Sequence, residues 1–153
     1  MVPGLPPPND ERGPLSVAGA RVKLDVDLDE YLESPPQEVW KALTDPALLA
    51  RWLMPNDFEA RVGKRFTFAP DCPTSWEGSV ACEVLELVPG RRMVWSWQTK
   101  GMEHPSRVIF ELSSSGTGTR LRLRHIGEAD EPIVRDLKGG WPGKVASLKN
   151  LAI

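Results

Sequence analysis

Several features that would place a protein in a particular class are scarce or missing in this sequence. It has two cysteines, Cys72 and Cys82, which are too few for a disulfide framework and lack the spacing of a zinc site. We expect both to be free thiols in a reducing compartment. No apolar run approaches the roughly 20 residues of a membrane-spanning helix, and the N-terminus lacks the pattern of a secretory signal. These absences predict a cytoplasmic protein that does not enter a membrane.

An excess of charge of one sign is also lacking. The 153 residues contain 19 lysines and arginines and 21 acidic residues, which gives a net charge of −2. Binding to nucleic-acid phosphates requires a basic stripe that this chain does not have. The sequence contains no phosphate loop, nucleophile elbow, metal-ligand cluster or catalytic triad. We therefore expect no nucleic-acid partner, no metal, no cofactor and no catalytic residue.

Tryptophan is the residue in excess, with six copies against a single tyrosine. Large aromatic rings either fill a core or line a pocket, and a sequence does not distinguish the two uses. The six residues come from separate segments, so we expect some of them to converge in space. The length favours a single domain, and the apolar fraction of 41% is ordinary for a globular protein.

Proline is concentrated at the beginning of the chain. Residues 1–18 contain Pro3, Pro6, Pro7, Pro8 and Pro14, with few apolar side chains between them. This composition predicts a disordered leader, and a proline-recognition motif is the alternative. We place one domain over residues 19–153.

Alternation of apolar and polar residues predicts strands along most of this domain. The alternating segments are 22–28, 65–68, 76–88, 92–99, 107–113 and 120–125. Leu85 and Leu87 break the phase of the third segment, which predicts a β-bulge. Short turns between successive segments predict an antiparallel meander. Arg120, Arg122 and Arg124 form a positive row on its outer face, either a solvated surface or a docking patch for an anion or protein.

Helix signals lie at both ends of this strand region. Ser34-Pro35-Pro36-Gln37 predicts a helix that Ser34 caps and Pro35 begins. Asp45-Pro46 predicts the start of a second helix. Near the C-terminus, a short helix around 133–137 is expected to stop at Gly139-Gly140. A final helix then starts near Trp141, and its apolar stripe requires a partner surface, for which the sheet is the obvious choice.

This order of elements, and several motifs within it, resemble the SRPBCC (START-like) superfamily. The segment from Ser34 to Pro46, with Trp52 downstream, looks like the opening of that superfamily. Gly118-Thr119-Arg120-Leu121 resembles its last strand, and Gly140-Trp141 resembles the start of its final helix. The resemblance is closest to bacterial relatives of the C-terminal domain of the chaperone-ATPase activator Aha. The turn at Gly63-Lys64 departs from the family, which usually has two glycines there.

The resemblance implies an α+β helix-grip fold like that of the birch-pollen allergens. In this fold, a curved antiparallel sheet of six or seven strands wraps around a long C-terminal helix, and two short helices follow the first strand. A cavity lies between the sheet and the long helix. Functions in the family are mixed, so the resemblance implies a cavity but no particular substrate.

We expect a protein that binds, carries or sequesters an apolar or aromatic small molecule. A co-chaperone-like module, with a chaperone or another protein as its partner, is the alternative from a different class. A cyclase- or hydrolase-type enzyme of the same fold is a third. We expect a monomer or a weak homodimer.

The expected ligand site lies between the sheet and the final helix, where Trp97 and Trp141 are nearest to the gap. We expect a cavity of roughly 300 Å³ or more at this place, edged by these two rings and by His125. Each aromatic residue could instead belong to the core, and His125 could be a strand-end histidine that bonds to backbone. The candidate ligand-binding residues are Trp52, Phe68, Trp76, Met93, Trp95, Trp97, Phe110, His125 and Trp141.

Overall fold

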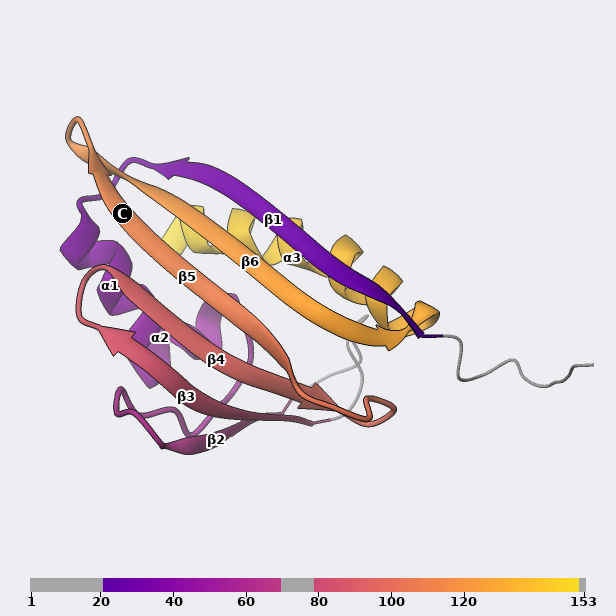
Figure 1. The fold of residues 1–153 in the computed structure, drawn as a ribbon. Coiled ribbons are helices and arrows are strands. Elements are labelled where there is room, and N and C mark those ends of the chain that lie inside the picture. Colours follow the sequence, from indigo (N-terminus) through magenta and orange to yellow (C-terminus); the bar gives the residue numbers. More distant parts are fainter. Residues whose placement is uncertain (1–20, 70–78, 152–153) are drawn as a thin grey trace, which may run out of the picture.

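The computed structural model describes residues 21–69 and 79–151, which form one antiparallel sheet and three helices (Figure 1). The predicted leader over residues 1–18, and Cys72 and Trp76 with it, fall outside this part of the chain. No helix of the described ranges is both long enough and apolar enough to cross a membrane.

Six strands make up the sheet, in the spatial order β1-β6-β5-β4-β3-β2. All neighbouring strands are antiparallel, and α1 and α2 follow β1, so the predicted α+β helix-grip fold is confirmed. Figure 1 shows the sheet curving across one side of α3. The elements are β1 (Arg21–Leu32), α1 (Pro36–Thr44), α2 (Pro46–Trp52), β2 (Arg65–Phe68), β3 (Val80–Val88), β4 (Arg92–Thr99), β5 (Ser106–Ser115), β6 (Gly118–Asp130) and α3 (Glu131–Leu151).

The predicted bulge lies in β3. Val84 pairs with Trp95 and Glu86 pairs with Val94, so Leu85 has no partner of its own in β4. The extra residue changes the phase of the strand and lets Leu87 pack against the core, as Val84 does. The apolar phase break in the sequence therefore marks the register shift between β3 and β4.

The two short helices begin by different means. Asp45 caps α2 as predicted, because its side chain accepts hydrogen bonds from the backbone N–H groups of Ala47 and Leu48. The predicted capping of α1 by Ser34 is wrong. The N-cap of α1 is Pro35, without a side-chain bond, and the buried Ser34 instead accepts a bond at its carbonyl from Thr119 Oγ1. This 2.7 Å bond ties the end of β1 to β6.

The expected break at Gly139-Gly140 is absent. A single helix of 21 residues runs from Glu131 to Leu151, with Pro142 inside it. Its buried residues fall at helical spacing on both sides of the glycine pair: Val134, Leu137, Trp141, Val145 and Leu148. Burial of this continuous stripe against the sheet outweighs the poor helix propensity of the local sequence.

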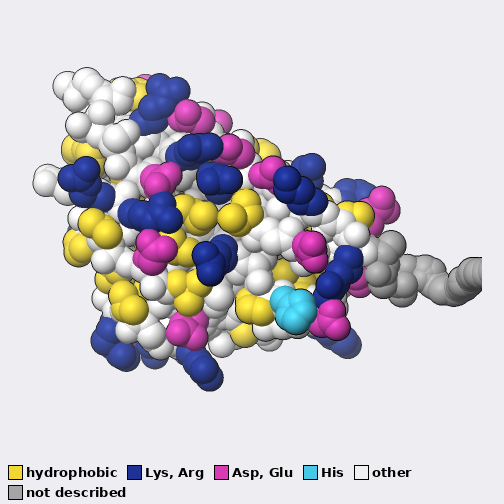
Figure 2. All heavy atoms as spheres, in the orientation of Figure 1, with side chains coloured by type: hydrophobic (Ala, Val, Ile, Leu, Met, Phe, Trp, Pro, Cys, Tyr) yellow, Lys and Arg dark blue, Asp and Glu magenta, His cyan; other side chains and the backbone are white. Residues whose placement is uncertain are grey.

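The outer face of the sheet carries ion pairs. Arg122 forms a bidentate pair with Asp27, and this hydrogen bonding holds the pKa of the Asp27 carboxyl below its usual value. Arg120 pairs in the same way with Asp29. Charged side chains of both signs are mixed with apolar ones on this face (Figure 2). The ion pairs of Arg120 and Arg122 therefore favour the interpretation of this row as a solvated surface over its interpretation as a docking patch.

The glycine of the Gly118-Thr119 motif has a steric role. A Cβ at Gly118 would lie 2.3 Å from the carbonyl oxygen of Leu32 and 2.4 Å from the hydroxyl oxygen of Tyr31. Because the nearest atom belongs to the backbone, Gly118→Ala is expected to lower the free energy of unfolding by about 1–3 kcal/mol. Urea denaturation followed by circular dichroism measures the change.

Gly139→Ala is the matched control. A Cβ at Gly139 meets no atom within 4 Å, and the residue lies in an exposed helix position. Alanine has the better helix propensity, so this variant is expected to gain about 1 kcal/mol. Equal stability of the two variants would contradict the steric role of Gly118.

Candidate functional site

His125 lies at the centre of the interior, where four side chains from four elements meet. It extends from β6 and is fully buried. Its Nδ1 lies 2.9 Å from the indole Nε1 of Trp141 in α3, and its Nε2 lies 2.7 Å from the hydroxyl oxygen of Ser106 in β5. The same hydroxyl donates to the carbonyl oxygen of Trp97 in β4, at 2.8 Å.

The donors and acceptors of this chain fix the form of the imidazole. An indole N–H only donates, so Nδ1 of His125 must accept the bond from Trp141. The neutral ring then carries its proton on Nε2 and donates to Ser106, whose hydroxyl donates onward to Trp97. Burial lowers the pKa of His125 to about 3, in agreement with a neutral ring. The alternative in which backbone satisfies this histidine is therefore wrong, because its partners are side chains.

The Ser106–His125 pair does not form a nucleophile with its base. A general base needs a free ring nitrogen facing the hydroxyl, whereas the Nε2 of His125 already carries a proton. Ser106 is also buried. The pair therefore joins β5 to β6, and its hydrogen bonds hold α3 against the sheet.

Ser106 is a residue that the sequence reasoning missed. The predicted strand began at Arg107, whereas β5 begins at Ser106. Ser106 shares its strand parity with the inward residues Val108 and Phe110, and this phase is the signal that could have placed it inside.

The other described candidate residues lie in the core. The ring of Trp95 packs against four phenylalanines, with ring centroids 4.7–5.7 Å apart. Two of the four are the predicted Phe68 and Phe110, and the inward-facing Met93 is also fully buried. Trp52 lies in α2, where its indole N–H donates to the carbonyl of Ala42 in α1 at 2.8 Å.

Trp97 connects this packed interior to a pocket. Its ring centroid is 5.6 Å from that of Trp141 and 5.3 Å from that of His125, so no open space separates the three rings. On another side, Trp97 lines a pocket of about 260 Å³ between the sheet and the N-terminal half of α3. Of the candidate residues in the described ranges, Trp97 alone lines this pocket. Contact of the others with a ligand stays a prediction.

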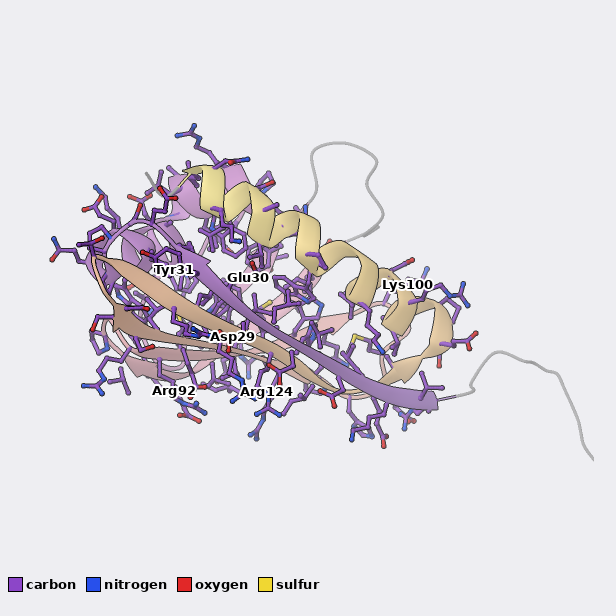
Figure 3. All side chains as sticks on the ribbon, turned by 90° about the horizontal axis from the view of Figure 1, so that it is seen from above. Asp29, Glu30, Tyr31, Arg92, Lys100 and Arg124 are labelled. Atoms are coloured by element: carbon purple, nitrogen blue, oxygen red, sulfur yellow. The ribbon has the colours of Figure 1, made fainter. Side chains whose placement is uncertain are left out.

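The pocket has an apolar base and a polar rim. Val80 and Thr99 are paired residues at the ends of β3 and β4, and Ile133 and Leu137 face them from α3. The full lining is Val80, Trp97, Thr99, Lys100, Ile133, Asp136 and Leu137. Except for Trp97, the sequence reasoning proposed none of these residues for a site. Figure 3 shows Lys100 beside the N-terminal half of α3.

A larger hollow of about 360 Å³ lies at the other end of the molecule. It is lined by Tyr31, Leu32, Glu33, Lys149 and Asn150, a largely polar set. A small-molecule site is usually an apolar concavity with a few polar groups. The pocket beside Trp97 fits that description better, although it is the smaller of the two.

The described part of the chain offers little reactive chemistry. Burial raises the pKa of the Cys82 thiol well above its usual range, so this cysteine does not supply a thiolate. No group of three or more His, Cys, Asp or Glu side chains in the described ranges could hold a metal ion.

Comparison with known proteins assigns the chain to a family. Residues 33–152 match the family described as "Activator of Hsp90 ATPase homolog 1-like protein", whereas the curated proteins contain no match. Protein MLL2253 from Mesorhizobium loti is 33% identical and has a TM-score of 0.72, over 83% of this chain and 95% of that chain. CalU16 from Micromonospora echinospora is 25% identical and has a TM-score of 0.67, over 87% and 86% of the two chains.

The Aha1 dimer from Colwellia psychrerythraea shares the fold at 18% identity, with a TM-score of 0.71 over 82% of this chain and 93% of that chain. The family match covers the two short helices, strands β2 to β6 and all of α3, and it begins directly after β1. This chain therefore belongs to the Activator of Hsp90 ATPase homolog 1-like family, within the SRPBCC superfamily.

Proposed function

We propose that this protein binds a small apolar or aromatic molecule in the pocket between Trp97 and the N-terminal half of α3. The observation that carries the proposal is the lining: Trp97, Val80, Ile133 and Leu137 form an apolar wall, and three polar side chains stand around it. Ligand pockets commonly combine an apolar wall with a few polar groups that orient the ligand.

The size of the pocket limits the ligand. Its volume of about 260 Å³ lies just below the range of roughly 300–1,000 Å³ that is usual for small-molecule sites. The cavity that the sequence predicted, edged by Trp97, Trp141 and His125, would have been larger and more central than this pocket. The proposed ligand is accordingly a compact one, such as a substituted or fused aromatic ring.

A co-chaperone-like module is the second candidate, and the filled centre of the interior favours it. The same candidate requires a contiguous exposed apolar patch. The large apolar residues that are exposed in the described ranges are Tyr31, Val62 and Val88, and they come from separate segments of the chain. Because this requirement lacks support, the pocket carries the primary proposal. Stimulation of the ATPase of a bacterial Hsp90 by the protein would favour the second candidate.

Filling the pocket tests the proposal. Thr99 is half-buried at the end of β4, so Thr99→Phe is expected to occupy the space beside Trp97 without removing core packing. Titration with the neutral dye N-phenyl-1-naphthylamine, whose fluorescence rises in apolar surroundings, measures binding. We expect saturable binding of one dye molecule per chain, and a loss of affinity of at least about tenfold in the variant (roughly 1.4 kcal/mol).

Ser96→Phe is the matched control, because Ser96 is a half-buried residue of the same strand on the opposite face of the sheet. It is expected to bind the dye as the unmodified protein does. The proposal fails if the unmodified protein binds no dye saturably, or if Thr99→Phe binds it unchanged.

A further inference from the structure

Two charged side chains stand at the rim of the proposed pocket, on opposite walls. Lys100 follows β4 directly, and Asp136 lies in the second turn of α3. Both side chains are exposed. Their separation onto two walls makes the rim electrically asymmetric, so an ionic group on a ligand would have a preferred side.

The two charges differ in their present contacts. Asp136 already takes part in an interaction elsewhere in the chain. Lys100 has no carboxylate within 4.0 Å among residues 21–69 and 79–151, whereas Arg21 is paired with Glu103 and Glu128. With respect to the described residues, the ammonium of Lys100 is therefore the charge at this rim that can accept a new partner without losing an old one.

A hydroxyl donor lies next to Lys100. Thr99 lines the pocket, and among the described residues its hydroxyl makes only a long bond, at 3.4 Å, to the carbonyl oxygen of Lys100. Because a hydroxyl rotates freely, it can turn to donate to a ligand oxygen. An ammonium and a hydroxyl on adjacent residues form a pair of donors suited to a carboxylate, which only accepts hydrogen bonds when ionised.

We infer that the ligand of this pocket is an aromatic or otherwise apolar acid whose carboxylate pairs with Lys100 and Thr99. Its apolar part lies against Trp97 and Val80 on the sheet wall, opposite the α3 wall that carries Asp136. This inference rests on the proposed function and adds the sign of the ligand's charge. A cationic ligand would need Asp136 to exchange its present interaction, and a neutral ligand could accept a hydrogen bond from Lys100 but would form no ion pair with it.

Three probes with one ring system and different charges test the inference on the full chain. They are 1-naphthoate, the neutral 1-naphthamide and the cation 1-naphthylmethylammonium, measured by isothermal titration calorimetry at low ionic strength. An exposed charge pair contributes modestly, so we expect naphthoate to bind about three- to tenfold more tightly than the amide, and the cation to bind most weakly. Added salt is expected to reduce this preference.

Lys100→Gln removes the charge at an exposed position and leaves the apolar wall intact. The variant is expected to bind naphthoate and naphthamide equally, and Lys100→Arg is expected to keep the preference. Lys41→Gln is the matched control, because Lys41 is exposed on α1 and does not line the pocket. It is expected to retain the full preference for the acid.

The outcomes separate this inference from the proposed function. Equal binding of the acid and the amide by the unmodified protein, or a preference that Lys100→Gln leaves unchanged, overturns the anionic ligand but keeps the pocket as a site. Tighter binding of the cation also overturns it and assigns the charge recognition to Asp136. If no probe binds, the proposed function fails together with the inference.

Discussion

Replacing Trp141 with alanine is expected to lower the free energy of unfolding by about 3–5 kcal/mol, the usual cost of truncating a buried tryptophan. Its ring is fully buried on the inner side of α3 and packs against Trp97 and His125. The truncation would leave a cavity at the centre of the interior. It would also remove the indole N–H that donates to His125 Nδ1. Chemical denaturation measured by far-ultraviolet circular dichroism gives the change.

Trp141→Phe separates the two contributions. Phenylalanine keeps most of the ring and leaves a buried ring nitrogen of His125 without its donor, which costs about 1–3 kcal/mol. A change of tautomer would not remove this cost, because the chain through Ser106 to Trp97 would then lose a bond instead. Unchanged stability of Trp141→Phe would mean that the bond contributes nothing to holding α3 on the sheet.

Trp40→Phe is the control for this pair. Trp40 lies in α1, is half-buried and packs at the edge of the core. No hydrogen bond of its indole group occurs in the described ranges, so the same substitution removes ring area alone. It is expected to cost clearly less than Trp141→Phe.

The fold was largely predictable because its signals are local. Asp45-Pro46 combines an acceptor for free backbone N–H groups with a residue that needs no hydrogen-bond partner of its own, so a helix start follows from two residues. Strand β4 coincides with the predicted segment 92–99, because alternation of large apolar residues sets both its limits and its buried face. The bulge in β3 was visible as a change of phase at Leu85 and Leu87.

The course of α3 was less predictable, because local and long-range effects oppose each other there. Relative to alanine, each of the three glycines at 139, 140 and 143 disfavours the helix by about 1 kcal/mol, and Pro142 disfavours it by about 3 kcal/mol. These local costs favour a break. Trp141 is nevertheless held by His125, which is 16 positions away in the sequence. The sequence did contain a signal for a continuous helix. Val134 and Leu137 lie at helical spacing from Trp141, so the apolar stripe continues across the glycine pair.

The pocket could not be derived from the sequence, because inward orientation does not determine whether rings leave a space between them. Trp95 and Phe110 both face inward, and their centroids are 4.7 Å apart, which leaves no gap. The space beside Trp97 instead depends on how the first turns of α3 lie over Val80 and Thr99. The lining residues of α3 all lie in the segment around 133–137 that was predicted to be helical, so the missing information was the position of this helix over the sheet.

Lowering the pH is expected to destabilise the protein through His125 while the carboxylates remain ionised. In the folded protein, burial among neutral groups lowers the pKa of His125 from 6.5 to about 3. Between these two values the unfolded chain takes up a proton that the folded chain does not, so stability is complete above pH 6.5 and falls as the pH falls toward 3. The loss is expected to be about 2 kcal/mol between pH 7.5 and pH 5.

His125→Gln provides the comparison for this pH dependence, because its amide can accept from Trp141 or donate to Ser106 and does not titrate. The variant is expected to be less stable at pH 7.5 and to lose little further stability down to pH 5. Among the described residues, the exposed His104 contacts the exposed Glu103, so His104→Gln is expected to keep the pH dependence that comes from His125. Urea denaturation at half-unit pH intervals gives both slopes. If the stability of the unmodified protein does not change between pH 7.5 and pH 5, His125 takes up a proton equally well in the folded and the unfolded chain. That result would contradict a buried, neutral His125 that accepts a hydrogen bond from Trp141.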